Sequence, residues 1–122
     1  MTTEAQQFAD RYTALWNERD PAARRAEIAA LWLPDGNHFV RTLSAQGYDA
    51  LFTRVTGSHE KNVRDGGYIF KAAPNAQQLQ DTVTFNWHMV RPESGDLVAT
   101  GLEFVKVNAQ LRIVTDYQFI IS

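Results

Sequence analysis

The sequence predicts an α+β domain in which N-terminal helices cover one face of a sheet built mainly by the last third of the chain. Apolar residues of the first third recur at helical spacing, whereas residues 81–122 contain three long runs that alternate with a period of two. Helices gathered early and antiparallel strands gathered late favour a helical layer on one side of an antiparallel sheet. A chain of 122 residues can build one hydrophobic core, so we expect a single domain over residues 1–122.

The first helix is predicted from Thr3 to about Glu18, because apolar residues there form one stripe at helical spacing. Thr3 and Gln6 have the spacing of a capping box. Tyr12 lies in the middle of the stripe, and Trp16 lies one turn later. The hydroxyl group of Tyr12 either lies at the edge of the core or points into a cavity, and both interpretations stay open.

A second helix is predicted from Pro21 to about Trp32. Asp20 is a favoured N-cap residue, and proline is favoured at the first helical position that follows it. Pro34 should end this helix, because its ring disfavours the helical conformation at Leu33.

A short strand is expected at residues 37–43, followed by a short amphipathic helix at residues 48–56. Residues 57–67 are polar and bounded by glycines, which predicts an exposed loop or a frayed helix end with His59 in solvent. His38 lies at the start of the strand, and it is either a structural histidine or a proton-transfer group.

Three strands joined by short turns are predicted over residues 81–91, 96–107 and 111–121. They are rich in Val, Ile, Thr and aromatic residues, and the joints between them are short enough for hairpins. Alternation gives the first and third strands one aromatic, mostly apolar face each. These faces carry Val83, Phe85, Trp87 and Met89 in the first strand, and Leu111, Ile113, Thr115, Tyr117 and Phe119 in the third.

Glu103 is the exception in the middle strand, whose two faces are otherwise apolar. A carboxylate is costly to bury unless it is paired or protonated. Glu103 therefore either lies at a rim or beside a basic residue, or it is a buried acid with a function.

Composition excludes several classes of function. The net charge is −2 and the pI is near 5.9, which favours neither nucleic acid nor an anionic membrane as a partner. No apolar run is long enough to span a bilayer, and no signal peptide is visible, so we expect a cytoplasmic protein. The chain has no Cys, and its 3 His residues lie in different elements without ligand spacing, so we expect no metal site.

Three stretches of the chain together resemble one superfamily. They are Asp10–Asp20 (DRYTALWNERD), Leu31–Val40 (LWLPDGNHFV) and Gly101–Phe119 (GLEFVKVNAQLRIVTDYQF). Their order and motifs resemble the nuclear transport factor 2-like superfamily, which includes the SnoaL-like polyketide cyclases and the ketosteroid isomerases. The resemblance implies a cone-shaped nuclear transport factor 2-like (cystatin-like) fold, with N-terminal helices packed on a curved, mainly antiparallel sheet. It also implies a homodimer formed through the outer sheet face.

The ketosteroid isomerase pattern, carried over by this resemblance, places a hydroxyl donor on Tyr12 and a protonated acid on Glu103. The general base of that pattern falls on Val40, which cannot accept a proton, and His38 could replace it from the same strand face. Asp116 falls on the outer face. The resemblance implies a pocket lined by Trp16, Val40, Phe85, Trp87, Met89, Thr115, Tyr117 and Phe119.

Two functions stay open. The first is an isomerase, cyclase or dehydratase that acts on a small apolar carbonyl compound without a cofactor. Tyr12 and Glu103 would hold the oxygen, and His38 would move a proton. The second is a non-catalytic ligand-binding module, or a dimeric interaction module of the same fold. The loss of the base at Val40 favours binding, whereas a histidine facing the pocket favours an enzyme.

Overall fold

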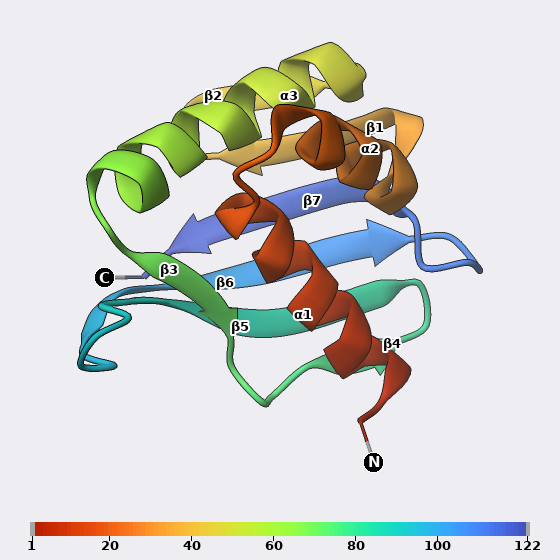
Figure 1. The fold of residues 1–122 in the computed structure, drawn as a ribbon. Coiled ribbons are helices and arrows are strands. Elements are labelled where there is room, and N and C mark those ends of the chain that lie inside the picture. Colours follow the sequence, from red (N-terminus) through yellow and green to blue (C-terminus); the bar gives the residue numbers. More distant parts are fainter. Residues whose placement is uncertain (1, 122) are drawn as a thin grey trace.

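The computed structural model describes residues 2–121, which form three α-helices, one π-helix and a seven-stranded sheet (Figure 1). The helices are α1 (Glu4–Asn17), α2 (Pro21–Leu31) and α3 (Gly47–Ser58), and the π-helix η1 (His59–Asp65) continues α3. The strands are β1 (Trp32–Val40), β2 (Leu43–Gln46), β3 (Ile69–Ala72), β4 (Gln77–Leu79), β5 (Thr82–Val90), β6 (Leu97–Val107) and β7 (Ile113–Ile120).

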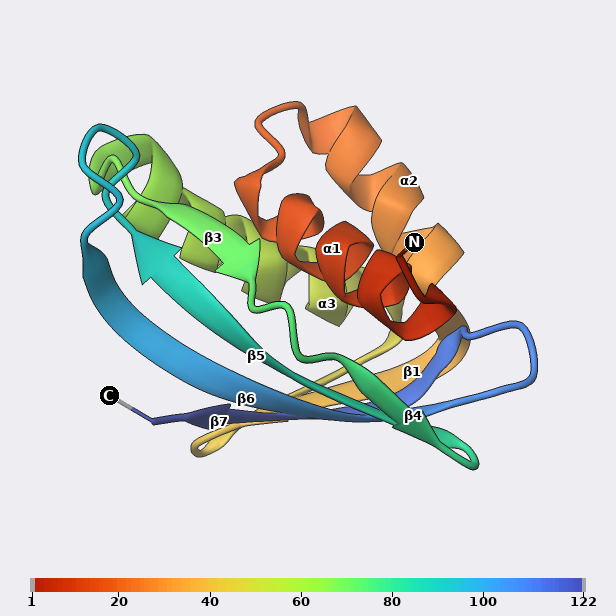
Figure 2. The same cartoon turned by 90° about the horizontal axis from the view of Figure 1, so that it is seen from below.

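The sheet has the strand order β2-β1-β7-β6-β5-β3, and β4 pairs with the first residues of β5. Every pairing is antiparallel except β1 with β7, which are parallel. Figure 2 shows all three α-helices on the same side of the curved sheet. The predicted α+β class and the helical layer on a curved, mainly antiparallel sheet are therefore confirmed. Within residues 2–121, no helix is long and apolar enough to cross a membrane.

Local sequence signals set the first two helices. Thr3 caps α1 by accepting a hydrogen bond from the backbone N–H of Gln6 at 3.0 Å. Asp20 caps α2 by accepting from Ala22, with Pro21 at the first helical position. The second helix ends at Leu31, one residue earlier than predicted, because the next residue already has extended backbone angles and begins β1.

The loop predicted for residues 57–67 is largely helical in the structure, and the prediction that His59 lies in solvent was wrong. Helix α3 continues to Ser58 and passes into η1, and His59 is buried with Nδ1 3.0 Å from the carbonyl oxygen of Trp16. Leu51, Val55, His59 and Val63 form one buried series with a spacing of four residues, the spacing of a helix face. The glycines and polar residues around this series concealed it.

An irregularity in β7 reverses the predicted faces of the third strand. Against β6, Lys106 pairs with Thr115 while Val107 pairs with Ile113, so β7 holds one extra residue at this point. Such a bulge shifts the alternation of side chains by one. Ile113 faces inward as predicted, but beyond the bulge Asp116 and Gln118 face inward too.

Three pocket predictions fail for this reason. Thr115, Tyr117 and Phe119 lie on the side of β7 opposite Asp116, and Tyr117 is 40% exposed and Phe119 54% exposed. Asp116, which was predicted on the outer face, is fully buried.

Candidate active site

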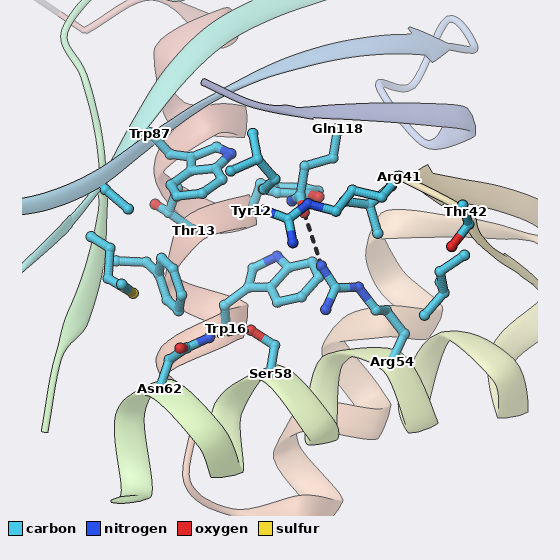
Figure 3. A pocket seen from close by; sticks show the side chains of 16 residues that line it. Tyr12, Thr13, Trp16, Arg41, Thr42, Arg54, Ser58, Asn62, Trp87 and Gln118 are labelled. Carbon is cyan, nitrogen blue, oxygen red and sulfur yellow. Dashed lines mark hydrogen bonds between the residues drawn. The ribbon is translucent and has the colours of Figure 1, made fainter. Parts of the chain in front are cut away.

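A cavity of about 400 Å³ lies between the helices and the inner face of the sheet. Trp16 comes from α1, Phe70 from β3, and Trp87 and Met89 from β5, so most of the lining is aromatic or apolar. At one end, which we call the polar end, Arg54 of α3 lies beside Gln118 of β7 and Tyr12 of α1, whereas Thr13, Ser58 and Asn62 are spaced along the rest of the lining (Figure 3).

Some of the predicted lining residues reach this cavity and others do not. Those that line it are Trp16, Val40, Trp87 and Met89, together with Tyr12. Phe85 faces the correct side of the sheet but is covered by α1, where its ring lies 5.5 Å from that of Tyr12 between centroids. Thr115, Tyr117 and Phe119 are on the outer face.

Asp116 is the central acceptor behind the polar end of the cavity. Its Oδ2 accepts from His38 Nδ1 at 2.7 Å and also from the hydroxyl group of Tyr12. Burial alone would raise the pKa of Asp116, but hydrogen bonds from Glu103, His38 and Tyr12 outweigh it and hold the pKa below its usual range. Asp116 is therefore ionised at neutral pH.

Tyr12 acts as a donor in this arrangement. Burial, followed by the negative charge of Asp116, raises the pKa of Tyr12 well above its usual value. Its hydroxyl group therefore stays protonated, and the proton is directed at Asp116.

Glu103 has the opposite protonation state from Asp116. Burial is the largest cause that raises the pKa of Glu103, and the charge of Asp116 raises it further. Its Oε1 accepts from Trp87 Nε1 at 3.0 Å and from Gln118 Nε2 at 2.6 Å.

The remaining oxygens of the two carboxyl groups identify the position of the Glu103 proton. Glu103 Oε2 and Asp116 Oδ1 are both buried, and neither meets an N–H or O–H donor from another described residue. A proton on Oε2 supplies the donor for the side-chain hydrogen bond that couples Glu103 to Asp116. The pair thus shares one proton and carries one negative charge.

Arg54 fixes the orientation of the remaining polar groups. Its Nε donates to His38 Nε2 at 3.2 Å, and its Nη2 donates to Gln118 Oε1 at 2.9 Å. Because a guanidinium group only donates, His38 must accept at Nε2 and carry its proton on Nδ1. Gln118 must likewise turn its oxygen to Arg54 and its amide nitrogen to Glu103.

These contacts form a closed hydrogen-bonded ring, which we call the buried ring. Its members are Arg54, His38, Asp116, Glu103 and Gln118. Arg54 contributes one positive charge and Asp116 one negative charge, so the ring is neutral overall. A buried network of this kind, in which each member bonds to two others, holds its side chains in one arrangement.

Gly101 of β6 supports the ring from the neighbouring strand. It pairs with Trp87 of β5, and a Cβ atom at this position would lie 2.1 Å from the indole ring. The absence of a side chain therefore lets the indole lie flat against β6, where its Nε1 reaches Glu103.

The structure brings Tyr12, His38 and Glu103 together around Asp116, and of these three only Tyr12 lines the cavity. Sequence reasoning missed Asp116 because of the β7 bulge, and it did not single out Arg54. The one available signal for Arg54 was its spacing of three residues from the buried Leu51 on α3. Among the described residues, no group of three or more His, Asp and Glu side chains could hold a metal ion.

Comparison with known proteins finds the same architecture in solved structures. A SnoaL-like protein from Agrobacterium tumefaciens superposes with a TM-score of 0.83 at 24% identity, covering 97% of both chains. An NTF2-like protein of unknown function from Exiguobacterium superposes with a TM-score of 0.70 at 19% identity, covering 94% of this chain and 98% of that one.

The chain has the nuclear transport factor 2-like fold. A polyketide cyclase candidate from Sinorhizobium meliloti shares this fold, with a TM-score of 0.65 at 13% identity over 92% of this chain and 93% of that one. The resemblance noted in the sequence is thus confirmed at the level of nuclear transport factor 2-like architecture. No protein-family model matches the sequence, and no curated protein matches it either.

Proposed function

We propose that the protein binds a small, largely apolar carbonyl compound in the cavity and acts on it by acid–base chemistry without a cofactor. The reaction class is that of an isomerase, cyclase or dehydratase. The observation that carries the proposal is the buried ring behind the polar end of an aromatic cavity. It keeps one carboxyl group ionised and its neighbour protonated. Neighbouring groups whose pKa values are shifted in opposite directions are typical of acid–base sites.

The shape and polarity of the cavity support a small, mainly apolar ligand. A cavity of roughly 150 Å³ holds a benzene molecule, so about 400 Å³ accommodates about two rings with substituents. Apolar walls with a few convergent polar groups are usual for small-molecule sites, because the polar groups fix the orientation of the ligand.

In this proposal Arg54 and His38 contact the reacting atoms. Arg54 donates to the carbonyl oxygen and stabilises the negative charge that develops there. His38 Nε2 removes the proton next to the carbonyl carbon, and the resulting enolate is protonated at another carbon or attacks a second carbonyl group. Asp116 keeps the His38 proton on Nδ1, which leaves the Nε2 lone pair free to act as the base.

The buried ring must open for this reaction. His38 is fully buried, and Nε2 accepts from Arg54 Nε across 3.2 Å. Proton transfer therefore requires Arg54 to move toward the carbonyl oxygen of the ligand. Tyr12 and Glu103 then act through Asp116 rather than on the ligand, a change from the roles predicted from the sequence.

The names of two structural neighbours agree with this class of reaction. The Agrobacterium protein is a proposed isomerase, and the Sinorhizobium protein is a proposed polyketide cyclase. These names describe those proteins, and at 24% and 13% identity they support the proposal only through the shared fold.

Non-catalytic ligand binding is the alternative, and one observation favours it. His38, Glu103 and Asp116 are all 0% exposed and are hydrogen-bonded to other side chains of the protein, which is also the arrangement of a structural polar core. In that case the ring would serve to hold Arg54 and Gln118 at the cavity edge.

One experiment on wild type and His38→Asn distinguishes an enzyme from a non-catalytic binding module. The asparagine amide can still donate to Asp116 in place of Nδ1, but it has no basic nitrogen. Small enones and bicyclic ketones are screened by thermal shift, and each stabilising compound is incubated and analysed by mass spectrometry and NMR. His88→Asn is the matched control, because His88 lies on the other side of β5 from Trp87 and outside the cavity lining.

If the protein is an enzyme, at least one compound will stabilise all three proteins, and only wild type and His88→Asn will convert it. Equal stabilisation with no conversion by any of them would support the binding module. Equal conversion by His38→Asn would remove His38 from the proposed mechanism.

We also propose a homodimer through the outer sheet face. Phe39 of β1, Tyr117 of β7 and Phe104 of β6 are adjacent in register and all partly exposed, and the first two rings stack at 5.6 Å between centroids. An exposed aromatic row across three strands is suited to a self-complementary contact. A dimer in sedimentation equilibrium at micromolar concentration that Tyr117→Lys converts to monomer would support this assembly, whereas a wild-type monomer would contradict it.

A further inference from the structure

The charged residues that line the cavity are all of one sign. Among the described residues, the only charged side chains in its lining are Arg41 and Arg54, and no carboxyl group faces it. Figure 3 shows both arginines at the polar end, Arg41 from the β1–β2 turn and Arg54 from α3. The buried carboxyl group of Asp116 compensates Arg54 from behind the cavity wall, whereas Arg41 has no ion-pair partner within residues 2–121.

Arg54 retains donor capacity toward the cavity. Its Nε and Nη2 are used within the buried ring, and no acceptor from the described residues bonds Nη1. The guanidinium group packs over the Trp16 ring, with Cζ 5.0 Å from the centroid, so its position is set by aromatic contact as well as by hydrogen bonds.

Arg41 holds an unusual backbone conformation at the cavity. Its φ angle is 51°, in the left-handed region, within the two-residue turn that joins β1 to β2. Such turn positions favour glycine, asparagine or aspartate, because a Cβ atom crowds the backbone there and only short polar side chains offset this by local hydrogen bonds. Strained positions of this kind are concentrated at functional sites.

Trp16 supplies a further unused donor. The residue is only 4% exposed, and its Nε1–H has no hydrogen-bond acceptor among the described residues. Figure 3 shows the indole nitrogen turned toward the middle of the lining side chains. An unsatisfied buried N–H costs free energy that a ligand acceptor would recover.

We propose that the carbonyl compound taken by this cavity also carries a carboxylate group, on an apolar frame of about two rings. Its carboxylate accepts from Arg54 Nη1, Arg41 and Trp16 Nε1, and its apolar part lies against Phe70, Trp87 and Met89. Three donors with no opposing carboxyl group match an anion with several lone pairs better than a neutral carbonyl group. This inference rests on the proposed function, because it names the class of compound that the same cavity would take.

The test compares two probes of the same shape and different charge. 1-Naphthoate is an anion at neutral pH, whereas 1-acetonaphthone is a neutral ketone. Isothermal titration calorimetry at low ionic strength should give at least a tenfold lower Kd for naphthoate on wild type. The preference should be the same at pH 6.5 and pH 8.5, because the naphthoate carboxylate keeps its charge throughout that range.

Two variants and one control test which residues bind the carboxylate group. Arg41→Met should reduce the preference for naphthoate three- to tenfold, and Trp16→Phe should weaken naphthoate binding while keeping the aromatic wall. Both residues can be changed without removing a hydrogen bond of the buried ring. Arg19→Met is the control, because Arg19 is exposed and outside this cavity, and it should bind naphthoate like wild type.

The binding results distinguish an error in the carboxylate inference from an error in the proposed function. If acetonaphthone binds as tightly as naphthoate, or if Arg19→Met reduces the preference as much as Arg41→Met, the carboxylate inference is overturned and a site for neutral carbonyl compounds remains. If neither probe binds at millimolar concentration, both the carboxylate inference and the small-molecule site are overturned.

Discussion

The two faces of β7 reverse the usual arrangement of a half-buried strand. The inward face carries Asp116 and Gln118, both largely buried, while the outward face carries the exposed Val114, Tyr117 and Phe119. Polar groups can occupy the interior here because the buried ring gives them hydrogen-bond partners. The comparison shows that the pattern of polarity along a strand does not identify its inner face when the interior contains such a network.

The largest expected effect comes from removing the inward carboxylate. Asp116→Ala leaves Tyr12 and His38 without their common acceptor and the charge of Arg54 without its compensating anion, so we expect a loss of about 3–5 kcal/mol in the free energy of unfolding. The control on the opposite face is Phe119→Ala, for which about 1 kcal/mol or less is expected. Urea denaturation of the two variants measures both values, and similar losses would refute the distinction between the faces.

The second prediction concerns the pH dependence that Glu103 produces. Its pKa is higher in the folded state than in the unfolded chain, so the folded state binds the extra proton. The stability from this group is complete below the unfolded pKa of about 4.3 and declines as pH rises toward the folded pKa, by at most about 1.4 kcal/mol per pH unit.

Glu103→Gln tests this dependence. The glutamine amide can donate to Asp116 and accept from Trp87 without titrating, so the variant should gain stability relative to wild type as pH rises from 5 to 8. Asp116 does not contribute over this range, because its lowered pKa costs stability only as pH falls below about 3.9. Parallel stability profiles for wild type and Glu103→Gln would show that Glu103 is ionised in the folded protein.

The smallest predicted effect lies on the strand that supports the inward face of β7. Gly101→Ala places a Cβ atom 2.1 Å from the Trp87 ring, so the indole must move and its bond to Glu103 weakens. Overpacking of this kind costs about 1–3 kcal/mol. Gly57→Ala is the control, since nothing lies within 4 Å of a Cβ there and alanine favours the surrounding α3 helix. Thermal unfolding should show opposite shifts, and equal shifts would contradict the close approach at Gly101.

The sequence predicted most of the fold because its signals are local. The caps at Thr3 and Asp20 determine where α1 and α2 begin, and regular alternation from Thr82 to His88 in β5 places Trp87 on the inner face. The resemblance added Tyr12 and Glu103, which the structure places on either side of Asp116.

What the sequence did not predict depends on pairing between distant segments. The extra residue in β7 becomes visible only when β7 is set against β6, and it moves Asp116 and Gln118 to the inner face. Arg54 carries no local sign of its role, because His38 and Gln118 meet it from two other strands. The contact partners of a buried polar group are set by the tertiary fold, which periodicity does not describe.

The position of β7 also constrains how the chain can fold. It is the last strand in sequence, yet it lies inside the sheet between β1 and β6, so those two strands meet only through it. Until β7 has been synthesised, the N-terminal part can form only two unjoined pieces of sheet. Long-range pairing of this kind slows folding, because the chain loses the entropy of loop closure before the favourable contacts between the strands form. Completion of the buried ring should therefore be among the last events in folding.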